Sequence, residues 1–365
     1  MLVFSSMVVY TSQVLFTGFS CKHPDLPSNS MNLQKAQGIT IMNYIVLDLE
    51  WNQCPTGKND EIPHLPFEII EIGAVKLDET HHILDQFQEV IKPVVYTTLH
   101  YKTKEIIRLK AIDFKSARSF PEVIADFWEW CGDSPIFCTW GPADLTELQR
   151  NLAYHHLASP FTFPLIYYDI QKIFSIVYED RKSRRSLESA VDYLQFPKNI
   201  PFHSALSDAC YTAQILQTIN EASILANSSV DYYRTPQNRR QEIYLSYDTY
   251  TKFVSKPFDT KTHALKDRVV SSTSCYLCSR TLQKKIRWFP VGSRNYCCLA
   301  YCKEHGYLKG KIRMRQREDG RYYAIKTLKL VSEETAYELY EKKEILKLKR
   351  KLKKEFSQNQ SFLQK

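Results

Sequence analysis

Short apolar runs alternate with polar segments and helical patterns in the first 220 residues of the chain. Residues 44–47 and 67–77 are apolar and rich in β-branched side chains, which predicts two buried strands, and residues 83–91 predict a third. The order of these runs favours an antiparallel meander. Two shorter strands are predicted at residues 135–140 and 165–168.

Helical patterns follow the strands. Residues 120–131 are amphipathic and have Pro121 at their start, where the missing N–H costs little. Residues 143–156 and the segment from Asp169 to Tyr178 also read as helices, and a long helix is predicted to begin just after His203. Strands that alternate with helices in this way predict an α/β domain.

Two carboxylates follow the first predicted strand. Asp48 and Glu50 are two residues apart, and side chains at positions i and i+2 of a strand point to the same face. Their charges repel, and burial makes each charge costlier. A divalent cation removes this conflict because hard cations take oxygen ligands. Such a pair is common at strand ends, so a metal site requires further ligands elsewhere in the chain.

Three later residues can complete the set. Asp144 lies in the first turn of a predicted helix, just past the carboxyl end of a strand, where ligand sites of α/β sheets collect. Compensation of the helix dipole explains an acid there equally well. Asp208 follows His203 by about one helical turn, so both can face one cavity. A histidine before a helix is, however, more often a cap or a surface group.

The chain has 365 residues, which allows two or three domains, and its 44% content of hydrophobic residues is sufficient for a packed core. It contains no run of about 18 apolar residues, so we expect no membrane partner. Residues 1–41 are expected to be a disordered extension or to precede a misassigned start, with Met42 as an alternative start. They lack the charged beginning and the cleavage site of a secretory signal.

Positive charge and cysteine are concentrated in the last part of the chain. Residues 275–365 hold 23 Lys and Arg against 9 Asp and Glu, a balance of +14 in a chain of net charge +9. This asymmetry favours a polyanionic partner, and a merely solubilising surface is the alternative. Five of the ten cysteines lie between residues 275 and 302, which indicates a cytoplasmic protein with a local cysteine cluster rather than a disulfide framework.

The cysteine cluster has the spacing of a metal site. Two pairs with CxxC-like spacing lie in a predicted small α+β domain of residues 275–331: Cys275 with Cys278, and Cys302 with His305. Two such pairs predict a tetrahedral zinc site that staples this domain. Cys297 and Cys298 lie nearby and could replace a ligand, and a group of buried thiols without metal is the alternative reading.

A basic hairpin is predicted within residues 311–330. Asp319 and Gly320 signal a two-residue type I′ turn, which would place Arg313 opposite Lys326. Like charges directly across strands are unfavourable, and a polyanion on that face would relieve the repulsion. Alternation predicts that four basic side chains share one face and bind nucleic acid: Lys311, Arg313, Arg315 and Arg317. Three nearby aromatic residues could stack bases or fill the domain core: Trp288, Tyr296 and Tyr301.

Two segments flank this domain. Residues 221–274 are expected to be a connector, with a helix in parts such as residues 240–253. Residues 332–365 are expected to form a basic helix, capped by Ser332, and a tail. That helix either lies on nucleic acid or is a solvated tail.

In chain order, the acids and the histidine resemble the motifs of the DEDDh family of 3′–5′ exonucleases. The matching segments are YIVLDLEWN with Asp48 and Glu50, WGPADLTELQRN with Asp144, and HSALSD with His203 and Asp208. We accordingly place the exonuclease domain at residues 42–220. The FEIIEIGAVKLD strand and the overall spacing look most like the KapD and Eri-type subgroup, which is chiefly linked to RNA trimming.

The resemblance implies an RNase H-like mixed sheet, in which the meander joins parallel strands, and a site for two Mg²⁺ or Mn²⁺ ions. Asp48 would bridge both ions, and Glu50 and Asp208 would complete the ion site that holds the attacking water. Asp144 would help to hold the second ion. His203 would be the general base, since imidazole titrates near neutrality.

The expected substrate is single-stranded nucleic acid, with RNA favoured. A DNA exonuclease of the repair or proofreading type is the alternative enzyme. A non-catalytic nucleic-acid-binding protein is the alternative outside enzymes. An inert relative would usually have lost one of the five active-site residues, whereas this sequence retains all five.

Overall fold

The structure is a computed structural model that describes residues 43–107 and 113–363. It divides into two compact units, Met1–Tyr233 and Arg234–Lys365, each with one six-stranded sheet. The expectations for residues 1–41 lie outside the described residues. In the described part of the chain, no helix has the length and apolar character needed to cross a membrane.

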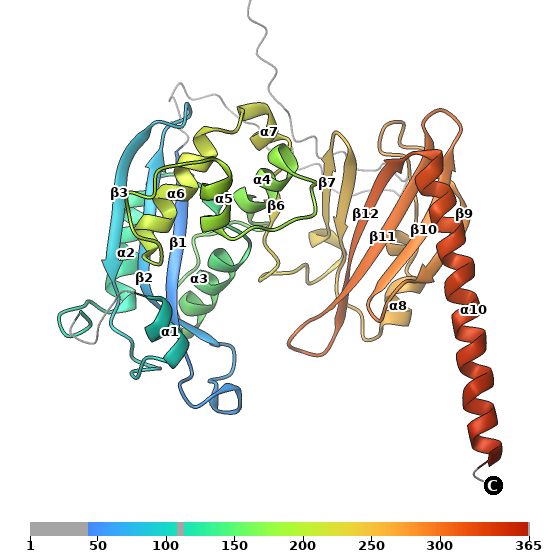
Figure 1. Cartoon of the computed structure of the whole chain (residues 1–365), viewed down its shortest axis with the longest axis horizontal. Helices are drawn as coiled ribbons and strands as arrows, with labels where there is room; N and C mark the ends of the chain where they lie inside the picture. The colour runs from blue at the N-terminus through green and yellow to red at the C-terminus, as the bar shows by residue number, and fades with distance from the viewer. Residues whose placement is uncertain (1–42, 108–112, 364–365) are drawn as a thin grey trace, which may run out of the picture. The chain divides into compact units, whose positions relative to one another are not determined.

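The first unit is a mixed α/β layer structure (Figure 1). Its sheet has the order β3-β2-β1-β4-β5-β6. The pairs β1–β2 and β2–β3 are antiparallel, whereas β1–β4 and β4–β5 are parallel, so the predicted RNase H-like mixed sheet is confirmed. Its elements are β1 (Tyr44–Gln53), η1 (Lys58–Asp60), β2 (Phe67–Leu77), β3 (Ile83–Val90), α1 (Tyr101–Ile106), α2 (Phe120–Cys131), β4 (Ile136–Thr139), α3 (Ala143–Tyr154), β5 (Ile166–Asp169), α4 (Ile170–Tyr178), α5 (Leu187–Tyr193), α6 (Ala205–Gln217), α7 (Glu221–Leu225) and β6 (Ser229–Val230).

Helices cover both faces of this sheet. Tyr44 and Val46 of β1 pack in a cluster with α4, α5 and α6. Ile45 and Leu47 point the other way and pack in a cluster with α2 and α3. Because side chains alternate along a strand, Asp48 and Glu50 continue the row that begins with Tyr44 and Val46. The apolar part of that row is buried, and its acidic end lies on the α6 side.

A glycine sets the approach of α6 to the sheet. Gly73 of β2 is paired with Asp48 of β1. A Cβ atom at position 73 would lie 2.0 Å from the backbone carbon of Ala205 and from the backbone nitrogen of Leu206. No side chain fits in that space, so the first turn of α6 lies directly against the backbone of β2. This contact brings the start of α6 to the strand that carries the first two acids.

The second unit contains an antiparallel sheet of order β7-β8-β12-β11-β10-β9 (Figure 1). Helices α8 and α9 contribute to a core on one face, with Ile312 and Met314. Helix α10 packs through Ala336 and Leu339 on another cluster, which includes Leu299 of β10. The elements are η2 (Arg239–Gln241), β7 (Ile243–Tyr247), β8 (Tyr250–Val254), α8 (Lys261–Lys266), α9 (Arg268–Ser271), β9 (Gln283–Pro290), β10 (Asn295–Cys302), β11 (Gly306–Gln316), β12 (Tyr322–Val331) and α10 (Glu333–Leu363).

Residues 221–274 are not a connector in the structure. Helix α7 and strand β6 belong to the first unit, where β6 pairs with β5. Strands β7 and β8 belong to the second sheet, so the helix expected in residues 240–253 is wrong. Strands β7 and β8 are only partly buried, so their sequences lack the long apolar run of a buried strand, and tyrosine is the main strand-favouring residue in them.

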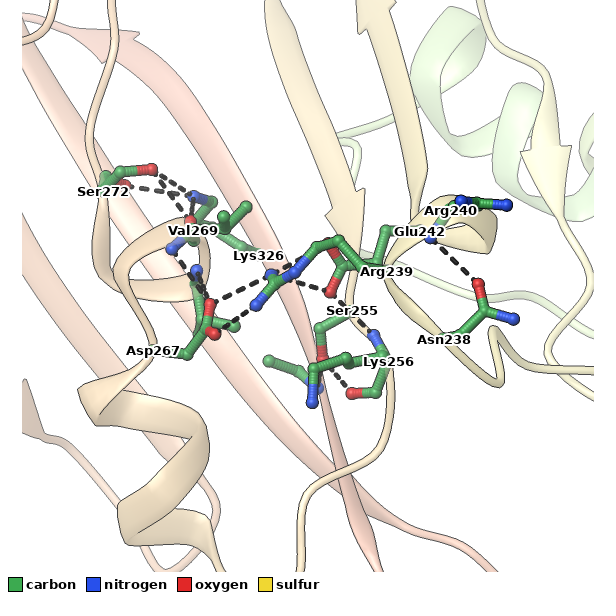
Figure 2. A network of polar contacts seen from close by, with 12 residues as sticks. Asn238, Arg239, Arg240, Glu242, Ser255, Lys256, Asp267, Val269, Ser272 and Lys326 are labelled. Carbon is green, nitrogen blue, oxygen red and sulfur yellow. Dashed lines mark hydrogen bonds and ion pairs between the residues drawn. The ribbon is translucent and has the colours of Figure 1, made fainter. Parts of the chain in front are cut away.

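Polar contacts hold the part of residues 221–274 that belongs to the second unit against its sheet (Figure 2). The Arg239 guanidinium is 3.0 Å from Glu242 Oε2 and 2.5 Å from Asp267 Oδ2, which links η2 to the start of α9. Lys326 of β12 is 6% exposed and its Nζ donates to the carbonyl oxygens of Val269 (2.7 Å) and Ser272 (3.1 Å). Burial lowers the pKa of Lys326 to about 8. These bonds hold α9 against the sheet.

The basic hairpin is formed by β11 and β12, but its predicted register is wrong by one residue. Arg317 N donates to Arg321 O, and Gly320 N donates to Arg317 O, so the loop has three residues and Gly320 takes a φ of 82°. A three-residue loop of this kind is the next most common after the two-residue turn. Arg313 therefore faces Ile325, and Lys326 faces Ile312. A one-residue shift moves side chains to the opposite face, which is why Lys326 is buried.

Candidate active site and metal centres

Three carboxylates from distant parts of the chain meet at the end of the buried row on β1. Asp48, Glu50 and Asp208 each offer an oxygen within 4.8 Å of the others. Asp48 and Glu50 come from one face of β1, and Asp208 comes from the first turn of α6. Oxygen ligands at this separation are suited to a hard divalent cation such as Mg²⁺. The cluster fits the predicted metal site.

Asp144 lies beside this cluster, but it is not one of the three carboxylates whose oxygens lie within 4.8 Å of one another. It is 5% exposed in the first turn of α3, directly after β4. Among the neighbouring charges that raise the pKa of Asp48, Asp144 is the strongest. The charges of Asp144 and Asp48 thus interact, and the helix dipole alone does not account for so buried an acid.

His203 lies at the edge of the cluster and is exposed. It takes a φ of 67°, a left-handed conformation that histidine adopts more readily than most residues. Its backbone N–H donates to Asp208 Oδ1 over 3.4 Å, which ties the loop before α6 to the acid. The imidazole has access to solvent, as a group that exchanges protons with a substrate water requires.

The acids hold their protons more tightly than ordinary carboxyl groups. Burial, followed by the charges of neighbouring acids, raises the pKa of Asp48 well above its usual range and that of Glu50 to about 8. Burial likewise raises the pKa of Asp144 to about 7 and that of Asp208 to about 6. Four acids in this environment cannot all ionise near neutral pH without a compensating positive charge.

A further acid, Glu71, belongs to this cluster and is absent from our sequence-based set. It is 2% exposed, is paired with Glu50 across β1 and β2, and raises the pKa of Asp48, Glu50 and Asp208. Its Oε1 accepts from Gln88 Nε2 (2.8 Å) and from Ser204 Oγ (3.2 Å). Glu71 thus holds the residue next to His203. Glu71 stands between apolar residues on both sides in the strand run of residues 67–77, and a glutamate so placed was the signal for it.

The second unit contains a separate group of four ligands. The distances are 3.6 Å for Cys275 Sγ to His305 Nδ1, 3.6 Å for Cys302 Sγ to the same nitrogen, and 3.7 Å for Cys278 Sγ to Cys302 Sγ. A tetrahedron with Zn–S bonds of about 2.3 Å and Zn–N bonds of about 2.0 Å has edges of roughly 3.5–3.8 Å. The geometry therefore fits the predicted set of four: Cys275, Cys278, Cys302 and His305.

Local turns build this site. Cys302 and His305 flank the turn between β10 and β11, and Ser279 N donates to Cys275 O in the turn that also carries Cys278. Burial opposes ionisation of Cys302, but hydrogen bonds from the His305 ring and from nearby backbone groups lower its pKa to about 6. A thiolate is the form that binds metal. Cys297 and Cys298 lie outside the group of four.

The basic residues of β11 lie as the alternation predicts, with one difference. Lys311, Arg313 and Arg315 are exposed, and the residues between them are buried. Arg317 instead lies just past the end of β11, where it flanks the hairpin loop, 3.4 Å from Asp319, and donates to Gln237. Of the aromatic residues, Trp288 and Tyr296 pack on the core beneath α8, whereas Tyr301 is 38% exposed.

The comparisons with known proteins concern mainly the first unit. Residues 45–216 match the family model for an exonuclease (RNase_T). No curated protein matches the chain. Among solved structures, the chain is similar to the nuclease domain of 3′hExo, a DEDDh family member, bound to rAMP. That likeness has 20% identity and a TM-score of 0.44, and it covers 53% of this chain and 97% of that one.

Two further solved structures are similar. Cell-death related nuclease 4 (CRN-4) has 20% identity and a TM-score of 0.42, over 52% of this chain and 66% of that one. E. coli exonuclease I in complex with a 5cy-dT13 oligonucleotide has 12% identity and a TM-score of 0.41, over 71% of this chain and 55% of that one. The exonuclease family model thus matches most of the first unit, and the three carboxylates that lie within 4.8 Å of one another all fall within the matched residues 45–216.

Proposed function

We propose that the first unit is a metal-dependent 3′–5′ exonuclease that hydrolyses phosphodiester bonds at the 3′ ends of RNA or short single strands. The observation that carries this proposal is the convergence of Asp48, Glu50 and Asp208 within 4.8 Å from segments far apart in the chain. Partly buried carboxylates that repel one another are stable together when cations lie between them.

Each residue of the site would have a distinct role. Asp48 would be a ligand of both of two divalent cations, and Glu50 and Asp208 would complete the ion site that holds the attacking water. Asp144 would hold the other. The exposed His203 ring would take the proton from the water as the scissile bond is attacked. When bound, the cations would activate the water and neutralise charge on the phosphate and the leaving oxygen.

A strand-specific assay tests this proposal. Purified full chain is incubated with single-stranded oligonucleotides labelled at the 5′ or the 3′ end, with Mg²⁺, with Mn²⁺ or with EDTA. We expect a ladder of shortened 5′-labelled products, early release of the 3′-labelled nucleotide, and no reaction in EDTA. Asp208→Asn should abolish the reaction, whereas Glu79→Gln, at an exposed acid of the same unit, should not. Full activity in Asp208→Asn would reject the proposal.

The preference for RNA rests on the KapD and Eri-type resemblance of the sequence. Sugar discrimination requires contacts to the 2′-hydroxyl. Matched RNA and DNA oligomers, and a DNA oligomer with a single 3′-terminal ribonucleotide, separate the alternatives. Faster hydrolysis of DNA than of RNA would favour the repair or proofreading type of exonuclease.

We propose that the four ligands of the second unit hold a structural Zn²⁺, because three cysteines and a histidine form a closed set with no position for a substrate. Metal analysis of the full chain should give one zinc per molecule. The nine cysteines in the described part of the chain are all free thiols, which favours a reducing compartment, and we propose that the protein is cytoplasmic. Cell fractionation tests that placement.

A further inference from the structure

The second sheet has a face that is only partly covered. Helix α10 packs on the residues of β9 and β10 that share this face, including Ile286, Phe289 and Leu299. Figure 1 shows α10 lying along this sheet and continuing past it. The neighbouring strands β11, β12 and β8 carry basic side chains on the same face. We call these residues the basic sheet face: Lys252, Lys309, Lys311, Arg313, Arg315 and Lys329.

The register places these residues together. Lys309 is directly opposite Lys329, and Thr327 lies between Lys311 and Lys252. Like charges opposite each other on adjacent strands destabilise a sheet. Along β11, basic residues at every second position are about 6.6–6.8 Å apart and form a line of positive charge. An anionic chain lying on the line would remove the repulsion.

Three of these residues, all on β11, have no carboxylate partner in the described part of the chain. Among the residues whose side chains the structure describes, no carboxylate forms an ion pair with Lys311, Arg313 or Arg315. Asp319, in the adjoining hairpin loop, lies 2.8 Å from Arg321 instead. Exposed, unpaired Arg and Lys in a row are the electrostatic footprint of a polyanion site.

Helix α10 lies along one border of this face. Its Ala336 and Leu339 pack in one cluster with Tyr307 of β11 and Leu299 of β10. On the other side, Tyr250 lies opposite Lys329 and stacks on Tyr247, with ring centroids 4.4 Å apart.

We propose that the basic sheet face binds the phosphate backbone of a single-stranded nucleic acid, with α10 as one border of the track. The choice of a nucleic acid over another polyanion rests on the proposed nuclease function of the first unit. A single strand is favoured because a sheet face with flanking aromatic residues gives both a line of charge and surfaces on which bases stack.

Binding is tested separately from hydrolysis. The full chain with Asp208→Asn, which should not hydrolyse the strand, is titrated without chelator and without added Mg²⁺ or Mn²⁺, so that the second unit keeps its zinc. The ligand is a fluorescein-labelled single strand of about 20 nucleotides, and anisotropy is followed over a range of salt concentrations. A triple variant removes three of the proposed contacts: Lys311→Ala, Arg313→Ala and Arg315→Ala. Its affinity should be lower by about tenfold or more. It should also reduce the slope of log K against log salt by about 2, at roughly 0.7 for each contact.

The matched control lies on the opposite side of the same sheet. Lys266 and Arg268 are exposed on α8 and α9, which pack on the other face. Lys266→Ala with Arg268→Ala should leave affinity and slope unchanged, and the double variant Lys311→Ala with Arg313→Ala gives a comparison of equal charge. Equal affinity in the two double variants would overturn the proposal, as would binding of polyglutamate but not of oligonucleotide. A failure of the nuclease proposal would appear instead as absent hydrolysis by the wild-type chain.

Discussion

The two ligand clusters differ in how the chain builds them. The acidic cluster draws Asp48 and Asp208 from segments about 160 residues apart in the chain, and burial together with repulsion raises their pKa values. The Cys/His cluster uses two short turns, and hydrogen bonds lower the pKa of Cys302. The first arrangement depends on the fold to hold like charges together. The second depends on a metal to hold turns together.

This difference suggests different roles. Carboxylates that are partly exposed and spaced for hard cations leave positions for water and substrate, which catalysis needs. Three thiols and an imidazole at tetrahedral spacing leave no such position. We therefore expect loss of the first cluster to abolish activity without unfolding, and loss of the second to unfold its unit.

The largest effect is expected from Asp48→Asn. Outer-shell partners of a metal typically contribute about 10–100-fold, and a central ligand should contribute more than that to kcat. The same change removes a partly buried charge that neighbouring acids repel, so the metal-free chain should become more stable at pH 8. Activity assays and thermal melts measure the two effects. If Asp48→Asn lost both activity and stability, the acidic cluster would have a structural role as well, which would contradict our assignment of a purely catalytic role to it.

The next largest effect concerns the second unit. Cys302→Ser should remove bound zinc and destabilise this unit, by less than the roughly 10–16 kcal/mol found for zinc-finger peptides, because apolar clusters also hold its sheet. Hydrogen exchange should show faster exchange in β10 and β11 and no change in β1. Cys297→Ser, at a buried thiol outside the ligand group, should retain zinc. Zinc loss in Cys297→Ser would reassign the ligands.

A smaller effect is expected from pH in the metal-free chain. The folded state raises the pKa of Glu50 to about 8, Asp144 to about 7 and Asp208 to about 6. The folded state therefore binds more protons than the unfolded state, and its stability falls as pH rises from about 5 to 8. The melting temperature should drop by about 2–4 °C for each kcal/mol lost. Saturating Mg²⁺ should weaken this dependence, and an unchanged slope with Mg²⁺ would argue against a cation in the cluster.

The smallest effect is expected from Glu71→Gln. This change keeps the size of the side chain but removes a charge that touches Ser204, next to His203. We expect a fall in kcat of about tenfold, with KM little changed, as for an outer-shell partner. Glu129→Gln, at an exposed position of α2, is the control. A change in KM alone would indicate that Glu71 acts on substrate binding instead.

The sequence predicted the first unit better than the second. Apolar strand runs, helix caps such as Asp169, and the order of acids are local signals, and the structure bears out the fold that they predicted. Glu71 was missed because its partner, Glu50, becomes adjacent only through strand pairing. The hairpin register was wrong because an Asp-Gly pair suits two different loops, and only tertiary packing of Ile312 and Lys326 selects between them.

The close contact at Gly73 has a consequence for how this domain can vary. The backbone of α6 lies directly against the backbone of β2 at Gly73. The distance between Asp48 and Asp208 therefore does not depend on the volume of any side chain between the helix and the strand. Bulky residues elsewhere in the interior can be exchanged for others while the acids keep their spacing. Position 73 has no such freedom, since even one methyl group would push the helix, and Asp208 with it, away from the strand.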